Sequence, residues 1–328
     1  MFTADQLRPY LPAALEKTDF KALGERYQGK VRDVYTQPER NLRILVATDR
    51  QSAFDIQWCS IPLKGQVLNQ ISAWWFERIV DIMPTQVLDV PDPNVTVAKR
   101  LQMMPIEIVV RGYLTGSSKT SAWMNYNAGV RDFCGVRLPD GMVKNQPFTS
   151  AILTPTTKGE DDELIDPPGI FTQKLATETQ WEEIADKALK LFARGQELAA
   201  KRGLILVDTK YEMGLDEEGT LMIADEVHTP DSSRYWVAAS YEKRFAAGLE
   251  PESLDKEFFR LWLRTQGFEY GDKATWPKIT DNVRLALSAK YIDLFERITG
   301  QKFTLPPVGS TAARIEKNLA KYRVGVAA

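Results

Sequence analysis

The sequence predicts an α+β protein with a small β-rich N-terminal lobe and a larger C-terminal α/β lobe. Short apolar or alternating segments, which are typical of strands, come first along the chain, and long helix-compatible segments come later. The length of 328 residues is sufficient for two lobes. We expect residues 1–112 to form the first lobe and residues 113–328 to form the second.

The N-terminal part mixes strand and helix patterns. Side chains alternate from Gly29 onward, which indicates a strand, and a later segment repeats apolar residues at helical spacing. Pro9 and Pro12 interrupt the first helix pattern. The expected elements are a short helix over 4–15, strands over 31–35 and 43–48, a helix over 64–82, and strands over 98–104 and 106–111.

The C-terminal part begins with a segment, residues 139–170, that is rich in Pro, Gly, Thr and acidic residues. This composition favours a long functional or disordered loop. An apolar run over 204–207 predicts a buried strand, and Gly214–Gly219 predicts a hairpin turn into a strand over 220–224. Helices are expected over 173–202, 232–247, 251–267 and 279–298.

Composition excludes several classes of protein. The formal net charge of −2 argues against nucleic acid as the main partner, since binding to phosphate backbones needs a basic excess. The two cysteines, Cys59 and Cys134, give neither a disulfide framework nor a zinc spacing, so we expect a reducing cytoplasm. The chain has no apolar run of membrane-spanning length and no signal-like N-terminus, so we expect no membrane partner.

The segment 223–236 holds the most informative group of polar residues. Asp225 and Glu226 directly follow a short apolar run, and adjacent carboxylates at a strand end suit a hard cation such as Mg²⁺. Asp231 and Arg234 lie close enough in sequence to bind an anionic or hydroxyl-bearing substrate beside that cation. The alternative is an acidic turn that contains Pro230 and only caps a helix.

A second group of charges lies just upstream. If the strand over 204–207 continues, Asp208, Lys210 and Glu212 share one of its faces. The hairpin expected after this strand would bring Glu212 near Asp225. A solvated hairpin face is the alternative, but the two segments together favour a site for a metal ion and phosphate.

The glycines at 24 and 29 lie in a partial match to a phosphate-binding loop of the Walker type. Val31 lacks the hydroxyl that this motif supplies to Mg²⁺, and the flanking sequence indicates strands rather than a strand followed by a helix. We therefore interpret the segment as a β-hairpin lid, in which Gly29 lets the backbone approach phosphates while Lys30 and Arg32 supply charge. An exposed basic hairpin is the alternative.

Further polar clusters are candidates for one cleft, although each is also typical of a turn or a cap. The only histidine, His228, is next to a Thr-Pro pair, and we assign it no catalytic role. The clusters are Asp49, Ser52 and Asp55 after a strand, Arg111 and Ser117 around a Gly-containing turn, and the loop 154–163 with Lys158.

Six of these blocks, in this order, resemble the signature blocks of the SAICAR synthetase (phosphoribosylaminoimidazole-succinocarboxamide synthase) family. The resemblance covers roughly residues 20–240, and the block with Asp231-Ser-Ser-Arg234 is especially specific. The blocks are residues 29–35, 47–55, 109–117, 154–158, 207–212 and 225–234.

The resemblance implies a two-lobed fold, similar to kinases and ATP-grasp enzymes, with nucleotide between the lobes. It also implies an ATP-dependent ligase of de novo purine synthesis. The carboxylate of carboxyaminoimidazole ribonucleotide (CAIR) would be phosphorylated by ATP, and the amine of L-aspartate would attack the acyl phosphate to give SAICAR, ADP and phosphate. Such chemistry needs fixed geometry, Mg²⁺ and cationic side chains rather than a covalent nucleophile.

The same resemblance implies roles for individual residues. Lys30, Asp208 and Lys210 would be catalytic, and Glu212 and Asp225 would bind Mg²⁺. The ATP site would comprise Gly29, Lys30, Val31, Arg32, Met103, Met104, Glu212 and Asp225. The substrates CAIR and L-aspartate would contact Asp49, Ser52, Arg111, Ser117, Lys158, Asp231 and Arg234. We expect a monomer or a small homo-oligomer.

Two other functions stay open at this point. A small-molecule kinase would share the carboxylates and the lid lysine, but the chain lacks a His-Arg-Asp loop and a Gly-x-Gly-x-x-Gly loop. An inactive nucleotide-binding regulator is disfavoured because Lys30, Glu212 and Asp225 are all present.

Overall fold

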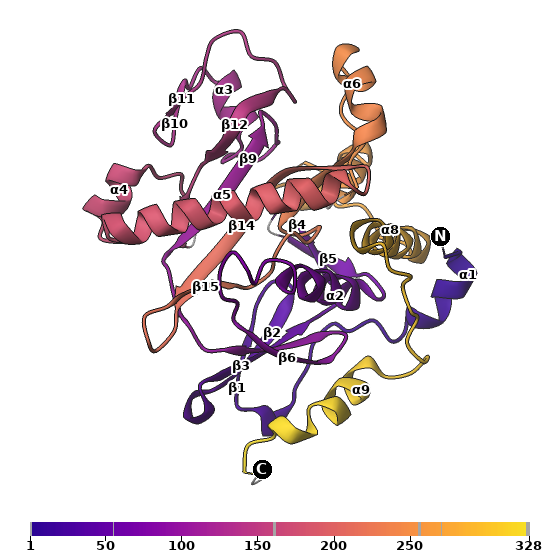
Figure 1. Cartoon of the computed structure of the whole chain (residues 1–328). Coiled ribbons are helices and arrows are strands. Elements are labelled where there is room, and N and C mark those ends of the chain that lie inside the picture. The colour runs from indigo at the N-terminus through magenta and orange to yellow at the C-terminus, as the bar shows by residue number, and fades with distance from the viewer. Residues whose placement is uncertain (1, 55, 160–161, 255–256, 270, 326–328) are drawn as a thin grey trace.

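The structure is a computed structural model that describes residues 2–54, 56–159, 162–254, 257–269 and 271–325. Two antiparallel sheets organise it, together with helices that pack between and around them (Figure 1). The α+β class predicted from the sequence is therefore confirmed. No helix within the described segments is long and apolar enough to cross a bilayer.

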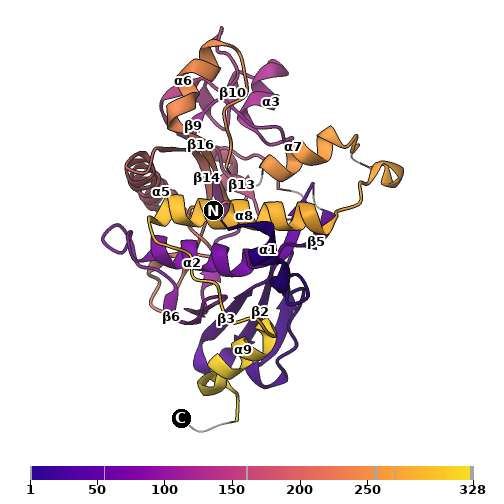
Figure 2. The same ribbon diagram turned by 90° about the vertical axis from the view of Figure 1, so that its right-hand side faces the viewer.

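The first sheet has the strand order β1-β2-β3-β7-β6. In β3, Ile44 and Val46 are fully buried in a cluster with Ile315 and Leu319 from the C-terminal segment, which packs on this sheet (Figure 2). Leu45 points to the other face, towards α2. The strands are β1 (Glu25–Gln28), β2 (Arg32–Gln37), β3 (Leu42–Ala47), β6 (Val87–Asp92) and β7 (Val95–Lys99).

The second sheet is built around one long strand, β14 (Leu204–Leu215). The first half of β14 pairs with β16, and its middle pairs with β9. Its C-terminal end pairs with β15 and β8. The helix α5 packs across this sheet (Figure 1). The other elements named here are β8 (Gln102–Met103), β9 (Ile106–Tyr113), β12 (Pro147–Leu153), β13 (Thr156–Thr157), β15 (Leu221–Ala224), β16 (Ser233–Val237) and α5 (Glu178–Ala200).

Helices α2 and α8 pack against each other, and their apolar residues join those of α5 and of the second sheet in the largest core cluster. A separate hairpin, β4–β5, precedes α2. The remaining bounds are α1 (Ala4–Leu7), β4 (Arg50–Ala53), β5 (Ile56–Ser60), α2 (Lys64–Phe76), α3 (Ala122–Asn127), β10 (Asp132–Phe133), β11 (Val136–Arg137), α4 (Pro167–Thr172), α6 (Ala238–Ala246), α7 (Glu257–Thr265), α8 (Asp281–Thr299) and α9 (Thr311–Asn318).

Several predictions from the sequence were wrong. The expected strand over 98–104 is two strands in different sheets, since β7 ends at Lys99 in the first sheet and β8 pairs with β14 in the second. Residues 139–170 are not one long loop, because they form β12, β13 and α4, and β12 and β13 pair with β9. The segment 232–247, expected to be one helix, begins as the strand β16. The backbone of β16 pairs with β14, and the aromatic side chains of Tyr235 and Trp236 are buried. The expected helix over 4–15 gives only α1 and a short 3₁₀ turn that contains Pro9.

The boundary expected at residue 112 stays a prediction. The strand β9, which spans it, belongs wholly to the second sheet, and α9 at the far end of the chain packs on the first sheet. The two sheets are thus linked by chain segments that pass between them more than once.

Candidate functional site

The hairpin of β14 and β15 brings two carboxylates together, as the sequence predicted. Glu212 pairs with Ala224 across the hairpin, and Asp225 is the next residue. Asp225 adopts a left-handed backbone conformation with φ of 59°, which turns the chain sharply as β15 ends. Burial raises the pKa of Asp225; the positive charge of Arg32 opposes this shift, and the negative charge of Glu212 adds to it.

Two lysines neutralise Glu212. Lys210 Nζ lies 3.0 Å from Glu212 Oε1 and 2.5 Å from Glu107 Oε1, and Lys158 forms a second ion pair with Glu212. Burial alone would raise the pKa of Glu212, but Lys210 and Lys158 outweigh it and lower the pKa to about 2. Glu212 is therefore ionised at neutral pH. Glu107 was not predicted, although a carboxylate inside the apolar strand β9 is a signal for it.

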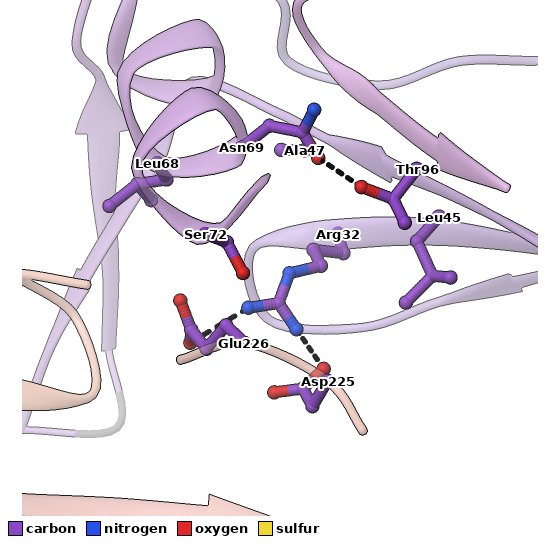
Figure 3. Close-up of a pocket in the computed structure, with 9 residues that line it drawn as sticks. All are labelled: Arg32, Leu45, Ala47, Leu68, Asn69, Ser72, Thr96, Asp225 and Glu226. Carbon is purple, nitrogen blue, oxygen red and sulfur yellow. Dashed lines mark hydrogen bonds and ion pairs between the residues drawn. The ribbon is translucent and has the colours of Figure 1, made fainter. Parts of the chain in front are cut away.

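Arg32 reaches across from the first sheet to the second. Its guanidinium forms an ion pair with Asp225, and its Nη2 lies 2.7 Å from Glu226 Oε1 (Figure 3). Burial disfavours the charged guanidinium, but the two carboxylates outweigh this effect and raise the pKa of Arg32. Arg32, predicted to contact ATP, thus balances the carboxylates that were predicted to bind metal.

The turn before β2 is held by a buried arginine that sequence reasoning missed. Arg50 donates from Nη2 to Gly29 O at 2.9 Å and from Nε to Lys30 O at 3.1 Å, and it pairs with Asp33. Gly29 N in turn donates to Arg32 O at 2.8 Å. These contacts fix the backbone of the turn and leave the side chain of Lys30 exposed. The backbone oxygen of Val31 accepts a hydrogen bond from Thr48 N at 3.0 Å.

A pocket of about 230 Å³ lies next to the carboxylates, and Lys210 is one of its lining residues. Asp208 also lines the pocket, where it pairs with Arg234 and lies 3.5 Å from Arg111 Nη1. Arg111 also donates from Nε to Thr154 Oγ1 at 2.8 Å. The β14 face predicted to carry Asp208, Lys210 and Glu212 therefore runs from the carboxylate pair into this pocket.

Asp231 lines the same pocket and is held by residues far away in sequence. Lys64 Nζ at the start of α2 donates to Asp231 Oδ2 at 2.7 Å, and the hydroxyl of Tyr291 in α8 donates to Asp231 Oδ1 at 3.1 Å. Lys64 was not predicted, because the sequence around it signals only the beginning of a helix. Ser117 does not line the pocket, but its Oγ donates at 3.1 Å to Oε1 of the lining residue Glu257.

Two predicted substrate residues lie away from this pocket. Asp49 is buried and accepts hydrogen bonds from Leu15 N at 2.7 Å and Gly65 N at 2.8 Å, so its contacts fix the start of α2. Burial raises the pKa of Asp49 to about 6, although both hydrogen bonds act in the opposite direction. Ser52 is buried on β4. The candidate Asp55 lies outside the described residues.

Met103 and Met104 lie where the chain enters the second sheet. Met103 is partly buried and packs against a small apolar cluster of the buried residues Leu101, Met222 and Ala224. Met104 N donates to Met213 O at 2.9 Å. Met103 and Met104 also line a pocket, together with Pro105 and Leu215.

The only histidine is in the core. His228 is fully buried, its ring meets Trp75 edge-on at 4.6 Å between centroids, and its Nε2 shares a hydrogen bond with the Tyr211 hydroxyl. Burial lowers the pKa of His228 to about 3, so the imidazole is neutral.

The family model described as SAICAR synthetase matches residues 25–277. The chain belongs to the SAICAR synthetase family. It is 48% identical to the phosphoribosylaminoimidazole-succinocarboxamide synthase of Legionella pneumophila (strain Paris), over 95% of this chain and 99% of that protein. A synthase from Bacteroides thetaiotaomicron is also 48% identical, over 94% of this chain and 98% of its own length.

A solved structure of SAICAR synthase from Saccharomyces cerevisiae, complexed with SAICAR, has a TM-score of 0.76 and 30% identity. It covers 89% of this chain and 100% of its own. The fold predicted from the family resemblance is therefore confirmed. The chain is a SAICAR synthase, a carbon–nitrogen ligase of de novo purine biosynthesis.

Proposed function

We propose that this SAICAR synthetase phosphorylates the CAIR carboxylate with MgATP and then joins it to L-aspartate at the pocket beside Glu212 and Asp225. The observation that carries the proposal is the continuous charged face of β14. Lys210 lies both beside Glu212 and in the lining of the pocket that contains Arg111 and Arg234. One lysine thus faces the place for nucleotide phosphates and the place for the acceptor carboxylate.

Glu212 and Asp225 suit a magnesium ion bound together with nucleotide. Mg²⁺ in phosphoryl-transfer sites is commonly bound by one or two carboxylates and by substrate phosphates, not by a cage of protein ligands. The bound ion would neutralise charge on the phosphate oxygens during transfer.

The cations already at this site also fit the proposal. Arg32 and Lys158 pair with Asp225 and Glu212, so the carboxylates are charge-balanced by flexible side chains that can turn to nucleotide phosphates. Lys30, exposed on a turn with a fixed backbone, would contact the same phosphates. The pocket lined by Met103 and Met104 would hold the adenine.

Arg111 and Arg234 would bind the phosphate of CAIR, because both guanidinium groups line the pocket and both are held there by Asp208. Asp231, held by Lys64 and Tyr291, would accept hydrogen bonds from the ribose hydroxyls or from the exocyclic amine. We also propose a cytoplasmic monomer or small homo-oligomer, since both cysteines are free thiols.

The test is ADP formation by purified protein with Mg²⁺, ATP and CAIR, in the presence and absence of L-aspartate. We expect ADP and SAICAR to accumulate together over many turnovers, and only when L-aspartate is present. ADP release without a ligated product would instead indicate a kinase or a stranded acyl phosphate. Omission of Mg²⁺ should abolish turnover, and turnover that persists with chelator present would refute the metal assignment.

A further inference from the structure

Helix α7 forms one wall of the substrate pocket and is fixed there by aromatic packing. Phe259 meets Trp58 of β5 edge-on at 6.3 Å between ring centroids, and Phe268, just after the helix, stacks on Phe54 at 5.2 Å. Figure 2 shows α7 beside the second sheet and above β5. Because its apolar face is held in this way, the helix presents Glu257 and Arg260 to the pocket.

Arg260 differs from the other cations that line this pocket. Arg111 and Arg234 share Asp208, and Lys210 contacts two carboxylates. Arg260, in contrast, makes a single ion pair in the described structure, from Nη1 to Glu257 Oε2 at 3.3 Å within its own helix. Its Nε is buried and has no hydrogen-bond partner.

This arrangement leaves one edge of the guanidinium, the edge with Nε and Nη2, available for a ligand. A buried donor without a partner is destabilising, and a carboxylate can accept from both nitrogens of such an edge. The side chain is 27% exposed, so a small solute can reach it from the pocket. The site therefore fits a carboxylate ligand.

We propose that Arg260 binds a carboxylate of L-aspartate and sets the affinity for this substrate; the inference rests on the function proposed above. L-Aspartate brings two carboxylates into the pocket, and each needs a cation when it leaves water. Arg111 and Arg234 are committed to Asp208 and to the CAIR phosphate, whereas Arg260 lines the same pocket from helix α7. Ligand binding there would leave the amine free to approach the activated CAIR carboxylate.

The test compares three variants by steady-state kinetics with each substrate varied in turn. For Arg260→Met we expect the KM for L-aspartate to rise at least about 30-fold, with the KM values for ATP and CAIR within about 3-fold of wild type. Arg260→Lys should recover part of this loss, because it keeps the charge but not the two-nitrogen edge.

Arg264→Met is the matched control. Arg264 lies one turn further along α7, and both guanidinium groups are 5.8 Å from the Phe54 ring centroid. Arg264 is exposed and does not line the pocket. We expect the kinetic constants and the melting temperature of Arg264→Met to match those of the wild type. A rise in the KM for L-aspartate that occurs only in Arg260→Met then does not come from a weakened helix.

Each outcome decides between the two proposals. An equal rise in KM for CAIR and aspartate in Arg260→Met, or no change in either, would overturn the role of Arg260. In both cases wild type and Arg264→Met would still show aspartate-dependent SAICAR formation, so the proposed function would stand. Absence of that activity in the wild type would overturn the function itself.

Discussion

The ion pair between Lys64 and Asp231 joins the core to the substrate pocket, and its removal gives a quantitative prediction. The two side chains are 0% and 4% exposed, and Nζ lies 2.7 Å from Oδ2. Lys64→Met removes the ammonium group but keeps most of the apolar volume. Asp231 would then be a buried carboxylate that still accepts a hydrogen bond from Tyr291 at 3.1 Å.

Removing one partner of a buried pair costs about 3–5 kcal/mol of unfolding free energy, because the remaining charge is left in a medium that solvates it poorly. The hydroxyl of Tyr291 offsets part of this cost, so we expect a loss of about 3 kcal/mol. The double variant Lys64→Met with Asp231→Asn should recover at least about 1 kcal/mol relative to the single variant, since it carries no buried charge.

The measurement is urea unfolding followed by tryptophan fluorescence. Lys190→Met serves as control, because Lys190 pairs with Asp186 on the surface of α5 with both side chains more than half exposed. Surface pairs contribute at most about 1 kcal/mol, so this variant should unfold close to the wild type. If Lys64→Met lost no more stability than Lys190→Met, the inference that the buried pair holds the pocket would be wrong.

Three further predictions concern the site and the core. Asp225→Asn should lower kcat by at least about 100-fold with an unchanged circular dichroism spectrum, because it removes the charge that we propose for Mg²⁺; near-wild-type turnover would exclude Asp225 as a metal ligand. Arg234→Ala should raise the KM for CAIR far more than that for ATP, and equal changes in both would remove Arg234 from the substrate pocket. The single imidazole of His228 should stay neutral in the native protein down to about pH 3, so the unfolded chain binds the extra proton and stability should fall as the pH drops below 6.5; a native titration near 6.5 in proton NMR would contradict the burial argument.

Local patterns were sufficient to predict the strand β14 and its hairpin. An apolar run followed by charges at every second residue predicts a strand with one buried face and one charged face. The turn bounded by glycines predicts a second strand that pairs antiparallel with the first. Glu212 and Asp225 were therefore placed side by side without any tertiary information. The order of six short blocks was also enough to identify the family.

Local patterns failed where tertiary pairing competed with them. Residues 139–170 are polar and rich in turn formers, yet β12 within them is a strand because β9 offers it a free edge. Tyr235 and Trp236 occur in a segment whose sequence fits a helix, but the N-terminal part of this segment is a strand because it is buried against β14. In each case the energy of pairing with a distant strand outweighs a weak local preference.

The sequence by itself determined the family, the α+β class and the carboxylates on β14. The tertiary structure alone decided which charged residues of the site pair with each other: Lys64 is 167 positions from Asp231, and Lys210 is 103 positions from Glu107. It also placed Arg260 on the pocket wall and Asp49 at the start of α2. The physical reason is that the sequence states which residues carry a charge. The partner, the burial and the pKa of such a residue depend on which distant segments fold against it.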